Sequence, residues 1–287
     1  MSRIAYVDGV YARFDQAAVH VEDRGFQFSD GVYEVCAVND GLLLDEVGHL
    51  DRLDRSLREL RISAPVSRNA LGVILREVAR RNRVRDGLVY LQVTRGVAPR
   101  NHAFPNPPVK PTLIVTARSH DQSARDASAA KGGKVITMPD LRWKRRDIKS
   151  VSLLPNVLAK QAAAEQGAIE AWLIDDAGYV TEGASSNAWI VTARDELITR
   201  PVSNEILRGV TRQGVVRLAE QQGVKFIQRQ FTVQEAYEAR EAFITAASAF
   251  VTPVTRIDDK LIHGGEPGPV SAAFRTAYRE RASAEAQ

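Results

Sequence analysis

The alternation of hydrophobic and polar positions divides the N-terminal third of the chain into strand-like and helix-like stretches. Two β-rich runs flank Asp8-Gly9 in IAYVDGVYARF, a pattern typical of a hairpin. From Asp45 the spacing changes to that of a helix with one apolar face, formed by Leu50, Leu53, Leu57 and Leu60. A second helix is predicted from Asn69 to Arg80. LVYLQVTRG and PTLIVTAR predict strands separated by the proline-rich loop APRNHAFPNPPVKP.

A polar stretch of small residues interrupts this pattern. SHDQSARDASAAKGG, residues 119 to 133, holds almost no bulky apolar side chain. We therefore expect an interdomain linker over residues 120–133, between a smaller N-terminal α/β domain at 1–119 and a larger domain at 134–287.

Strands and helices alternate again after the linker. The strand KVITMP precedes LLPNVLAKQAAAEQG, in which Pro155 suits the first turn of a helix and Gly167 stands just past its end. AWLIDD, YVTEGASSNAWIV and KFIQRQF predict strands, and GVTRQGVVRLAEQQG predicts a helix. The last twenty or so residues predict a surface helix with a frayed end. The whole pattern favours a mixed α/β fold.

Composition narrows the class of protein. The 287 residues are 44% hydrophobic and 26% charged, as in ordinary soluble domains. No apolar run approaches the roughly 20 residues of a membrane span, and MSRIAYVDGVYARF lacks the apolar core of a signal peptide. We therefore expect a cytoplasmic protein without a membrane partner.

The sequence also argues against a disulfide-stabilised protein, a metalloprotein and a nucleic-acid-binding protein. The single cysteine, Cys36, excludes an intrachain disulfide framework. The five histidines lack the spacing of metal ligands, so no metal is expected. The net charge is +4 and the isoelectric point is near 9.3. The arginines are spread along the chain and often adjoin Asp or Glu, which favours a solvated surface over nucleic-acid binding.

Lys149 is the first candidate for chemistry. The chain uses 31 arginines and eight lysines, and Lys149 follows a cationic cluster in RWKRRDIKSVSLL. Lysine can lose its proton, whereas arginine cannot. Desolvation and neighbouring cations favour the neutral amine, and a neutral amine can form a Schiff base. The alternative is an ordinary surface lysine.

Two further stretches could bind a charged ring or a phosphate. Glu182 follows a strand in VTEGASSN and could hold a proton on a pyridine nitrogen, which makes the ring an electron sink. ILRGVTR places Gly209, Val210 and Thr211 at a helix start, where backbone N–H groups attract phosphate. Arg52 in HLDRLDR could add a bidentate cation. Ordinary turn, capping and surface roles are the alternatives.

Arg100 and His102 lie two residues apart in the proline-rich loop. Such a pair can grip a carboxylate through charge and directed hydrogen bonds. Without further context, the same two residues could also be ordinary loop residues.

In their order along the chain, these stretches resemble one known family. DGVYEV, HLDRL, YLQVTRGVAPRNHAFP, RWKRRDIKSVSLLPNVLAKQ, VTEGASSN, ILRGVTR and FITAASAFVTPV cover about residues 6 to 256. They are similar to motifs of the class IV, fold-type IV aminotransferases that use pyridoxal 5'-phosphate, and within that group to the D-amino acid aminotransferases. The resemblance implies two domains, the larger of which has a barrel-like sheet and binds the cofactor.

The resemblance also implies roles for individual residues. Lys149 matches the lysine that bonds to the cofactor and moves the proton, and Glu182 matches the carboxylate facing the pyridine nitrogen. The implied phosphate contacts are Arg52, Val210, Thr211, Ala246 and Ala247. The implied trap for the substrate α-carboxylate is Tyr33, Arg100 and His102, with Arg100 and His102 supplied by the neighbouring subunit of a homodimer. Tyr90 matches a substrate-side position and Ser185 a cofactor-side position. Relatives often have hydroxyl residues where this chain has Ala184 and Ala247.

The activity implied is amino transfer between D-amino acids, of the D-alanine or D-glutamate type, and 2-oxo acids such as pyruvate and 2-oxoglutarate. A branched-chain L-amino acid aminotransferase, an (R)-amine transaminase and an aminodeoxychorismate lyase are alternatives with the same fold. A catalytically silent basic interaction protein is the alternative from another class.

Overall fold

The first sheet begins with the predicted hairpin. In the computed structural model, which describes residues 3–286, β1 (Ile4–Val7) pairs antiparallel with β2 (Val10–Arg13). The turn residues Asp8 and Gly9 have φ of 50° and 103°. These left-handed values explain why Asp-Gly occupies the turn.

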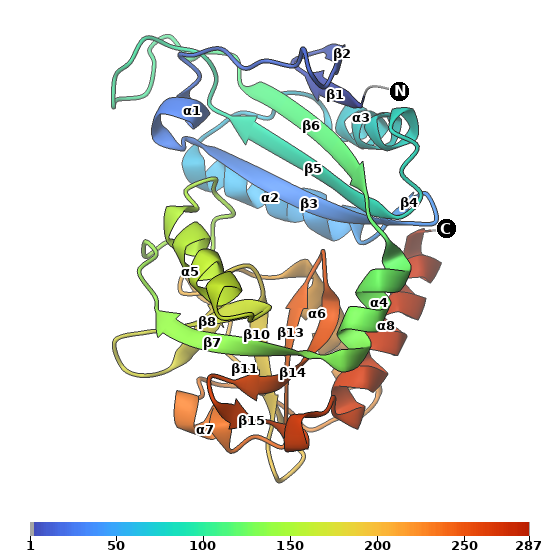
Figure 1. The fold of residues 1–287 in the computed structure, drawn as a ribbon. Helices are drawn as coiled ribbons and strands as arrows, with labels where there is room; N and C mark the ends of the chain where they lie inside the picture. The colour runs from blue at the N-terminus through green and yellow to red at the C-terminus, as the bar shows by residue number, and fades with distance from the viewer. Residues whose placement is uncertain (1–2, 287) are drawn as a thin grey trace. The chain divides into compact units, whose positions relative to one another are not determined.

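Six strands form this sheet, in the order β2-β1-β6-β5-β3-β4 (Figure 1). The further strands are β3 (Gly31–Asn39), β4 (Leu42–Leu43), β5 (Gly87–Thr94) and β6 (Thr112–Ser119). The helices of this unit are α1 (Arg24–Phe28), α2 (Glu46–Leu60) and α3 (Arg68–Arg81). Leu50, Leu53 and Leu57 of α2 are buried in one hydrophobic cluster with side chains of α3 and the sheet. The helical spacing of the leucines therefore predicted the packed face correctly.

A short segment from later in the chain completes the first unit. Residues up to Gln122 and the segment Ile148–Ser152 form one compact unit. The Tyr33 N–H donates to the Lys149 carbonyl at 3.0 Å, and the Val151 N–H donates to the Gly31 carbonyl at 3.1 Å. Lys149 is therefore held beside β3 by backbone hydrogen bonds.

The second unit, Ser123–Asp147 with Leu153–Ala284, contains a nine-stranded sheet that forms a half-barrel (Figure 1). Its strand order is β12-β11-β10-β13-β14-β7-β8-β9, and β15 pairs with β14. The strands are β7 (Gly133–Pro139), β8 (Glu170–Ile174), β9 (Val180–Gly183), β10 (Asn187–Val191), β11 (Leu197–Thr199), β12 (Phe226–Gln228), β13 (Glu241–Ala246), β14 (Phe250–Ile257) and β15 (Lys260–Leu261). Trp172 and Phe231 pack edge to face in one of its buried clusters.

The remaining elements are mostly helices of the second unit. They are α4 (Gln122–Lys131), α5 (Leu154–Glu165), α6 (Val210–Gln221), α7 (Val233–Tyr237), the 3₁₀ turn His263–Gly265 and α8 (Pro269–Ala286). Pro155 lies in the first turn of α5, as predicted. α8 is the predicted terminal helix, and its Phe274 and Tyr278 are buried. The predicted fraying includes Gln287, which lies outside the described residues.

The interval predicted as a linker contains α4. Asp126 of this helix pairs with Arg275 and Arg279 of α8, so its polar residues are used in packing between helices. The domain limits at residues 119 and 134 stay a prediction.

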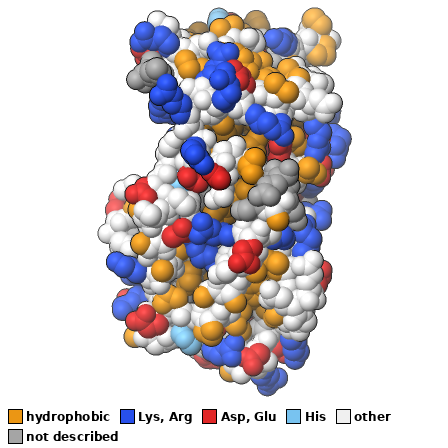
Figure 2. Space-filling view, turned by 90° about the vertical axis from the view of Figure 1, so that its right-hand side faces the viewer, with side chains coloured by type: hydrophobic (Ala, Val, Ile, Leu, Met, Phe, Trp, Pro, Cys, Tyr) orange, Lys and Arg blue, Asp and Glu red, His pale blue; other side chains and the backbone are white. Residues whose placement is uncertain are grey.

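Charges of both signs are mixed on the surface. On the face shown in Figure 2, Lys and Arg side chains lie among those of Asp and Glu. Within residues 3–286, no helix has both the length and the apolar composition that crossing a membrane requires.

Candidate active site

Lys149 is fixed through its backbone while its side chain reaches an aromatic ring. Its N–H donates to the Ser56 hydroxyl at 3.3 Å, and its Nζ lies 4.1 Å from the centroid of the Tyr33 ring. Across the described part of the chain, this amine forms an ion pair with no carboxylate. The amine is therefore not committed to a structural ion pair.

Tyr33 and Tyr90 lie together on the first sheet. Tyr33 is opposite Gln92, and Val35 is opposite Tyr90, so the tyrosines occupy diagonal positions on one face. Their rings stack with centroids 5.7 Å apart, and the Tyr90 hydroxyl donates to Gln92 at 2.7 Å. Burial, together with the nearby Tyr33, raises the pKa of Tyr90 to about 12. The structure thus brings Tyr33, Tyr90 and Lys149 together in one unit.

Arg52 is held by a buried carboxylate that the sequence reasoning missed. Its Nε and Nη2 each donate to Glu34 at 2.7 Å, and His49 Nδ1 lies 2.8 Å from the same carboxylate. Burial alone would raise the pKa of Glu34, but Arg52 and His49 lower it to about 2. The strand alternation was an available signal, because it places Glu34 on the buried face with Val32 and Cys36.

Arg100 and His102 are exposed in the loop between β5 and β6. The Arg100 guanidinium carbon lies 4.6 Å from the centroid of Phe28, and the His102 ring centroid lies 5.3 Å from it. Among residues 3–286, no hydrogen bond, ion pair or ring contact joins either residue to Tyr33. Two members of the expected carboxylate trap therefore contact the same ring, that of Phe28, and neither of them contacts Tyr33 within the described residues of this unit.

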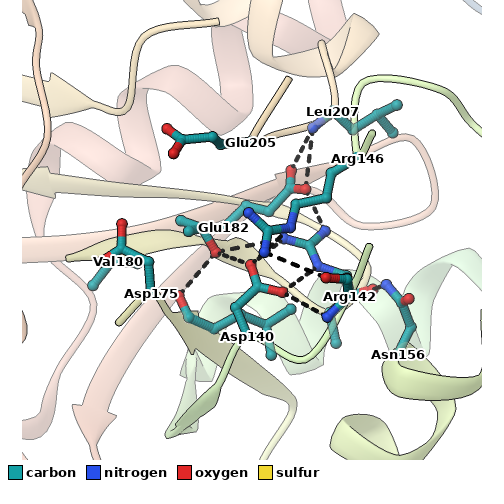
Figure 3. Close-up of polar contacts among 12 residues, drawn as sticks. Asp140, Arg142, Arg146, Asn156, Asp175, Val180, Glu182, Glu205 and Leu207 are labelled. Atoms are coloured by element: carbon teal, nitrogen blue, oxygen red, sulfur yellow. Dashed lines mark hydrogen bonds and ion pairs between the residues drawn. The ribbon is translucent and has the colours of Figure 1, made fainter. Parts of the chain in front are cut away.

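In the second unit, the Glu182 carboxylate accepts hydrogen bonds from several donors (Figure 3). Its Oε1 accepts from Arg142 Nη1 at 2.5 Å, and its Oε2 accepts from Asn187 Nδ2 at 2.8 Å. The Leu207 N–H lies 3.1 Å from both oxygens. Burial raises the pKa of the Glu182 carboxyl, and the Arg142 guanidinium and the Leu207 N–H oppose that rise. The carboxylate is thus locked in one orientation.

Arg142 is itself oriented by a second carboxylate. Its Nε and Nη2 donate to Asp140 at 2.9 and 2.8 Å, and the Thr181 hydroxyl donates to Asp140 at 2.7 Å. In the sequence, Arg142 appeared only as one member of a cationic cluster. Its pairing with Glu182 joins residues 40 positions apart, which local spacing does not reveal.

Ser185 is tied to a different buried acid. Its N–H and its hydroxyl donate to Glu170 Oε2 at 3.1 and 2.7 Å, and the Ser186 hydroxyl donates to the same oxygen at 2.9 Å. The adjacent Ala184 packs in a hydrophobic cluster that includes Leu173. A methyl group suits this position, so the structure accounts for the missing hydroxyl at Ala184.

The start of α6 forms a cradle of backbone donors. Gly209 is the N-cap, and no side chain of the described residues caps the helix. A Cβ added to Gly209 would lie 2.1 Å from Asn187 Oδ1, so only glycine fits here. Val210 and Thr211 are buried, and the Tyr278 hydroxyl donates to the Thr211 hydroxyl at 3.3 Å. Open N–H groups at such a helix start suit an anion.

Ala246 and Ala247 lie at the turn between β13 and β14. The Ala249 N–H donates to the Ala246 carbonyl at 3.1 Å, which closes the turn. Alanine at position 247 offers only backbone groups there, and the next turn residue that carries a hydroxyl is Ser248. In the part of the chain that the structure describes, no group of three or more His, Cys, Asp or Glu side chains could hold a metal ion.

The predicted residues thus form two sets, one in each unit. The first set is Tyr33, Arg52, Tyr90, Arg100, His102 and Lys149, and the second is Glu182, Ser185, Val210, Thr211, Ala246 and Ala247. Each set contains groups that donate and groups that accept hydrogen bonds. Comparison with known proteins identifies the family: the model of amino-transferase class IV matches residues 31–257, and the chain belongs to this family.

Individual relatives extend the similarity over nearly the whole chain. A D-alanine aminotransferase of Staphylococcus haemolyticus is 39% identical over 277 residues, 96% of each chain. One of Bacillus licheniformis is 42% identical over 264 residues, 92% of each chain. The structure of a branched-chain amino acid aminotransferase of T.th. with pyridoxamine 5'-phosphate aligns with a TM-score of 0.89 at 26% identity, covering 99% of this chain and 95% of that one. The resemblance inferred from the motifs is confirmed.

The buried Glu34 leads to a prediction about acid stability. Folding lowers its pKa from 4.5 to about 2, so its stabilisation is complete above pH 4.5 and is lost as the pH falls toward 2. A shift of this size corresponds to about 3 kcal/mol. Glu34→Gln should lower the free energy of unfolding by about that amount at pH 7 and by much less near pH 2. Urea unfolding at a fixed protein concentration measures the free energy of unfolding at both pH values.

Glu77→Gln is the matched control. Glu77 also binds two arginines, Arg80 and Arg81, but on the surface of α3, where solvent screens the interaction. We expect this variant to unfold like the wild-type protein at every pH. Equal losses in the two variants would contradict the assignment of the acid sensitivity to Glu34.

Proposed function

We propose that this protein is a pyridoxal 5'-phosphate-dependent D-amino acid aminotransferase. It transfers the amino group of D-amino acids such as D-alanine or D-glutamate to 2-oxo acids such as pyruvate or 2-oxoglutarate. The observation that carries the proposal is the similarity to D-alanine aminotransferases over 92–96% of the chain. The Arg100-x-His102 pair in the loop between β5 and β6 supports the choice of substrate.

The residues of the two sets fit this cofactor. The Lys149 amine, which no ion pair of the described residues occupies, can bond to an aldehyde. The oriented carboxylate of Glu182 has lone pairs left for a ring N–H. The open helix start at Val210 and Thr211 suits the phosphate, with Arg52, Ser185 and the Ala246-Ala247 turn as further contacts. Because Ala247 has no hydroxyl, its contribution to phosphate affinity would come from backbone amides. When bound, the cofactor accepts the electron pair that proton loss leaves at the substrate Cα.

Lys149 is the proposed acid and base. In its neutral form, the Nζ amine would take the proton from the substrate Cα and then deliver it to the cofactor carbon that carries the amino nitrogen. The backbone pairing of Lys149 with Tyr33 keeps this amine on a fixed stem. Glu182 keeps a proton on the ring nitrogen, since the donors Arg142, Asn187 and Leu207 hold its carboxylate in one orientation.

The carboxylate trap decides which enantiomer reacts. The Cα–H bond must point at Lys149, so the side on which the α-carboxylate is held selects the hand of the substrate. Tyr33, Arg100 and His102 are the proposed trap, and Tyr90 is a proposed substrate-side neighbour. Arg100 supplies charge and His102 a directed donor.

We propose a homodimer in which Arg100 and His102 serve the neighbouring subunit's site. Within residues 3–286 of one chain, no contact joins these two residues to Tyr33, and this supports the arrangement. One face of α5 also carries exposed apolar side chains at helical spacing, namely Leu154, Val157 and Leu158, which suits a subunit contact. The cytoplasmic location also stays a prediction.

Cofactor attachment has a direct chemical test. The purified protein with bound cofactor should be yellow, and borohydride should fix the cofactor to Lys149 in a form that peptide mass spectrometry locates. Lys149→Ala should abolish this fixation because no other amine takes its place. Lys260→Ala, at an exposed strand, should leave it intact. A protein that stays colourless after incubation with pyridoxal 5'-phosphate would contradict the proposed cofactor and favour the non-catalytic alternative.

The choice of substrate is tested by turnover with 2-oxoglutarate. D-alanine should react more than about tenfold faster than L-alanine or L-leucine, a difference of roughly 1.4 kcal/mol in transition-state binding. L-alanine isolates the effect of chirality, and L-leucine tests the branched-chain alternative. Faster turnover of L-leucine would overturn the D assignment. (R)-1-phenylethylamine in the same assay measures (R)-amine side activity.

The trap is tested by Arg100→Ala. Loss of charge-assisted hydrogen bonds worth about 1.5–3 kcal/mol should raise KM for 2-oxoglutarate and D-alanine by roughly 10- to 100-fold. The Kd for pyridoxal 5'-phosphate, from absorbance titration of the cofactor-free protein, should stay within about twofold. An equal loss of substrate and cofactor affinity would count against the trap.

A further inference from the structure

We propose that Arg24 is the positioning residue that fixes the loop carrying Arg100 and His102, and that it thereby sets the affinity of the enzyme for the substrate α-carboxylate. This inference rests on the proposed function. Arg24 itself touches neither substrate nor cofactor in this proposal, because it acts through the backbone of the loop.

The guanidinium of Arg24 binds three consecutive carbonyls of the loop. Arg24 is buried at the start of α1. Its Nη1 donates to the Asn101 carbonyl at 2.5 Å and lies 3.3 Å from the Ala103 carbonyl. Its Nη2 donates to the His102 carbonyl at 3.3 Å. The planar fork of an arginine can serve several acceptors at fixed angles, which the single ammonium of a lysine cannot do.

A shared carboxylate anchors this guanidinium. Asp30 accepts from Arg24 Nε at 2.8 Å and from Arg95 Nε and Nη2 at 2.7 and 2.9 Å. Arg95 in turn donates to the carbonyls of Leu60 and Arg61 at the end of α2. Burial alone would raise the pKa of Asp30, but Arg95 and Arg24 lower it below its ordinary value. Asp30 thus ties Arg24 to the rigid part of the unit.

The same short helix also contacts the side chains of the trap. The ring of Phe28, at the end of α1, lies 4.6 Å from the guanidinium carbon of Arg100 and 5.3 Å from the His102 ring. The guanidinium carbon of Arg24 lies 4.9 Å from this ring as well. α1 is fixed at its start, because the Asp23 carboxylate accepts from the Gly25 N–H and the Thr94 hydroxyl. One element, α1, therefore contacts both the backbone of residues 101–103 and the side chains of Arg100 and His102.

The energetic argument concerns preorganisation. Fixing the backbone of a residue costs conformational entropy, and an irregular loop has no ladder of hydrogen bonds to offset that cost. With Arg24 in place, the entropy cost of ordering the backbone of residues 101–103 is met when the protein folds. Without Arg24, the loop would be ordered only when substrate binds, so substrate affinity would fall while the chemical step stayed intact.

The test uses the holoenzyme and four variants: Arg24→Met, Arg24→Lys, Arg100→Ala and the double variant Arg24→Met/Arg100→Ala. Arg24→Met should raise KM for D-alanine and 2-oxoglutarate about tenfold, with kcat within about threefold of wild type. Arg24→Lys should give KM values between those of the wild-type protein and those of Arg24→Met, because the ammonium keeps the positive charge but loses the planar fork of donors. The double variant should bind substrate no worse than Arg100→Ala, because both changes remove the same contact.

A second readout needs no activity. The exposed Arg100–Asn101 bond is a trypsin site whose cleavage requires local release of the loop. Cleavage of Arg24→Met at this bond should be about tenfold faster than cleavage of the wild-type protein. Arg13→Met is the matched control, since Arg13 also makes a two-pronged pair with an aspartate, Asp15, but at the surface. It should leave KM and cleavage after Arg100 unchanged.

The outcomes separate the two proposals. Unchanged KM and unchanged cleavage in Arg24→Met would overturn the positioning role, as would KM effects that multiply in the double variant. A fall in melting temperature with unchanged KM would also overturn it, because it would assign Arg24 a purely structural role. If Arg24→Met does not fold, Arg24→Lys carries the same measurements. A wild-type protein that prefers L-amino acids would overturn the proposed function, and the trypsin readout would still decide whether Arg24 fixes the loop.

Discussion

The pairing of residues 149–151 with β3 is the interaction on which the proposed chemistry depends. The Lys149 carbonyl takes the N–H of Tyr33, and the Gly31 carbonyl takes the N–H of Val151. These bonds hold a catalytic lysine candidate beside a strand that begins far earlier in the chain. The next inward residue of that strand, Glu34, orients Arg52. One strand therefore sets the positions of a lysine, a tyrosine and an arginine at once.

Buried carboxylates do most of the remaining positioning. Glu34 holds Arg52, Asp30 holds Arg24 and Arg95, and Asp140 holds the arginine that binds Glu182. A buried carboxylate without donors would be very costly. Each acid is therefore satisfied within its own unit, and the geometry of its arginine is fixed in return. Rigid orientation of this kind is what an active site requires from the residues around it.

The sequence predicted the regular elements and the proposed contact residues, but not the partners that orient them. The leucine spacing of α2 and the Asp-Gly turn are local signals, and both were confirmed. The interval expected to be a linker contains α4. The sequence did not predict this helix, because it buries only Ala129 and otherwise carries small or polar residues. Arg24 lies 77 positions from Asn101, a pairing that exists only after the sheet has formed. The spacing of hydrophobic residues predicts which face of a helix or strand is buried, but it does not predict which distant residue packs against that face.

The scarcity of lysine in this chain has a physical explanation. Arginines such as Arg24, Arg95, Arg200 and Arg212 are buried, where each donates to backbone carbonyls or carboxylates. A guanidinium keeps its charge and offers a rigid fork in such places, whereas a buried ammonium readily loses its proton. The property that makes lysine a poor structural anchor makes it a good proton carrier. A chain that anchors itself with arginine therefore leaves the amine of Lys149, which forms no ion pair among the described residues, available for the proposed chemistry.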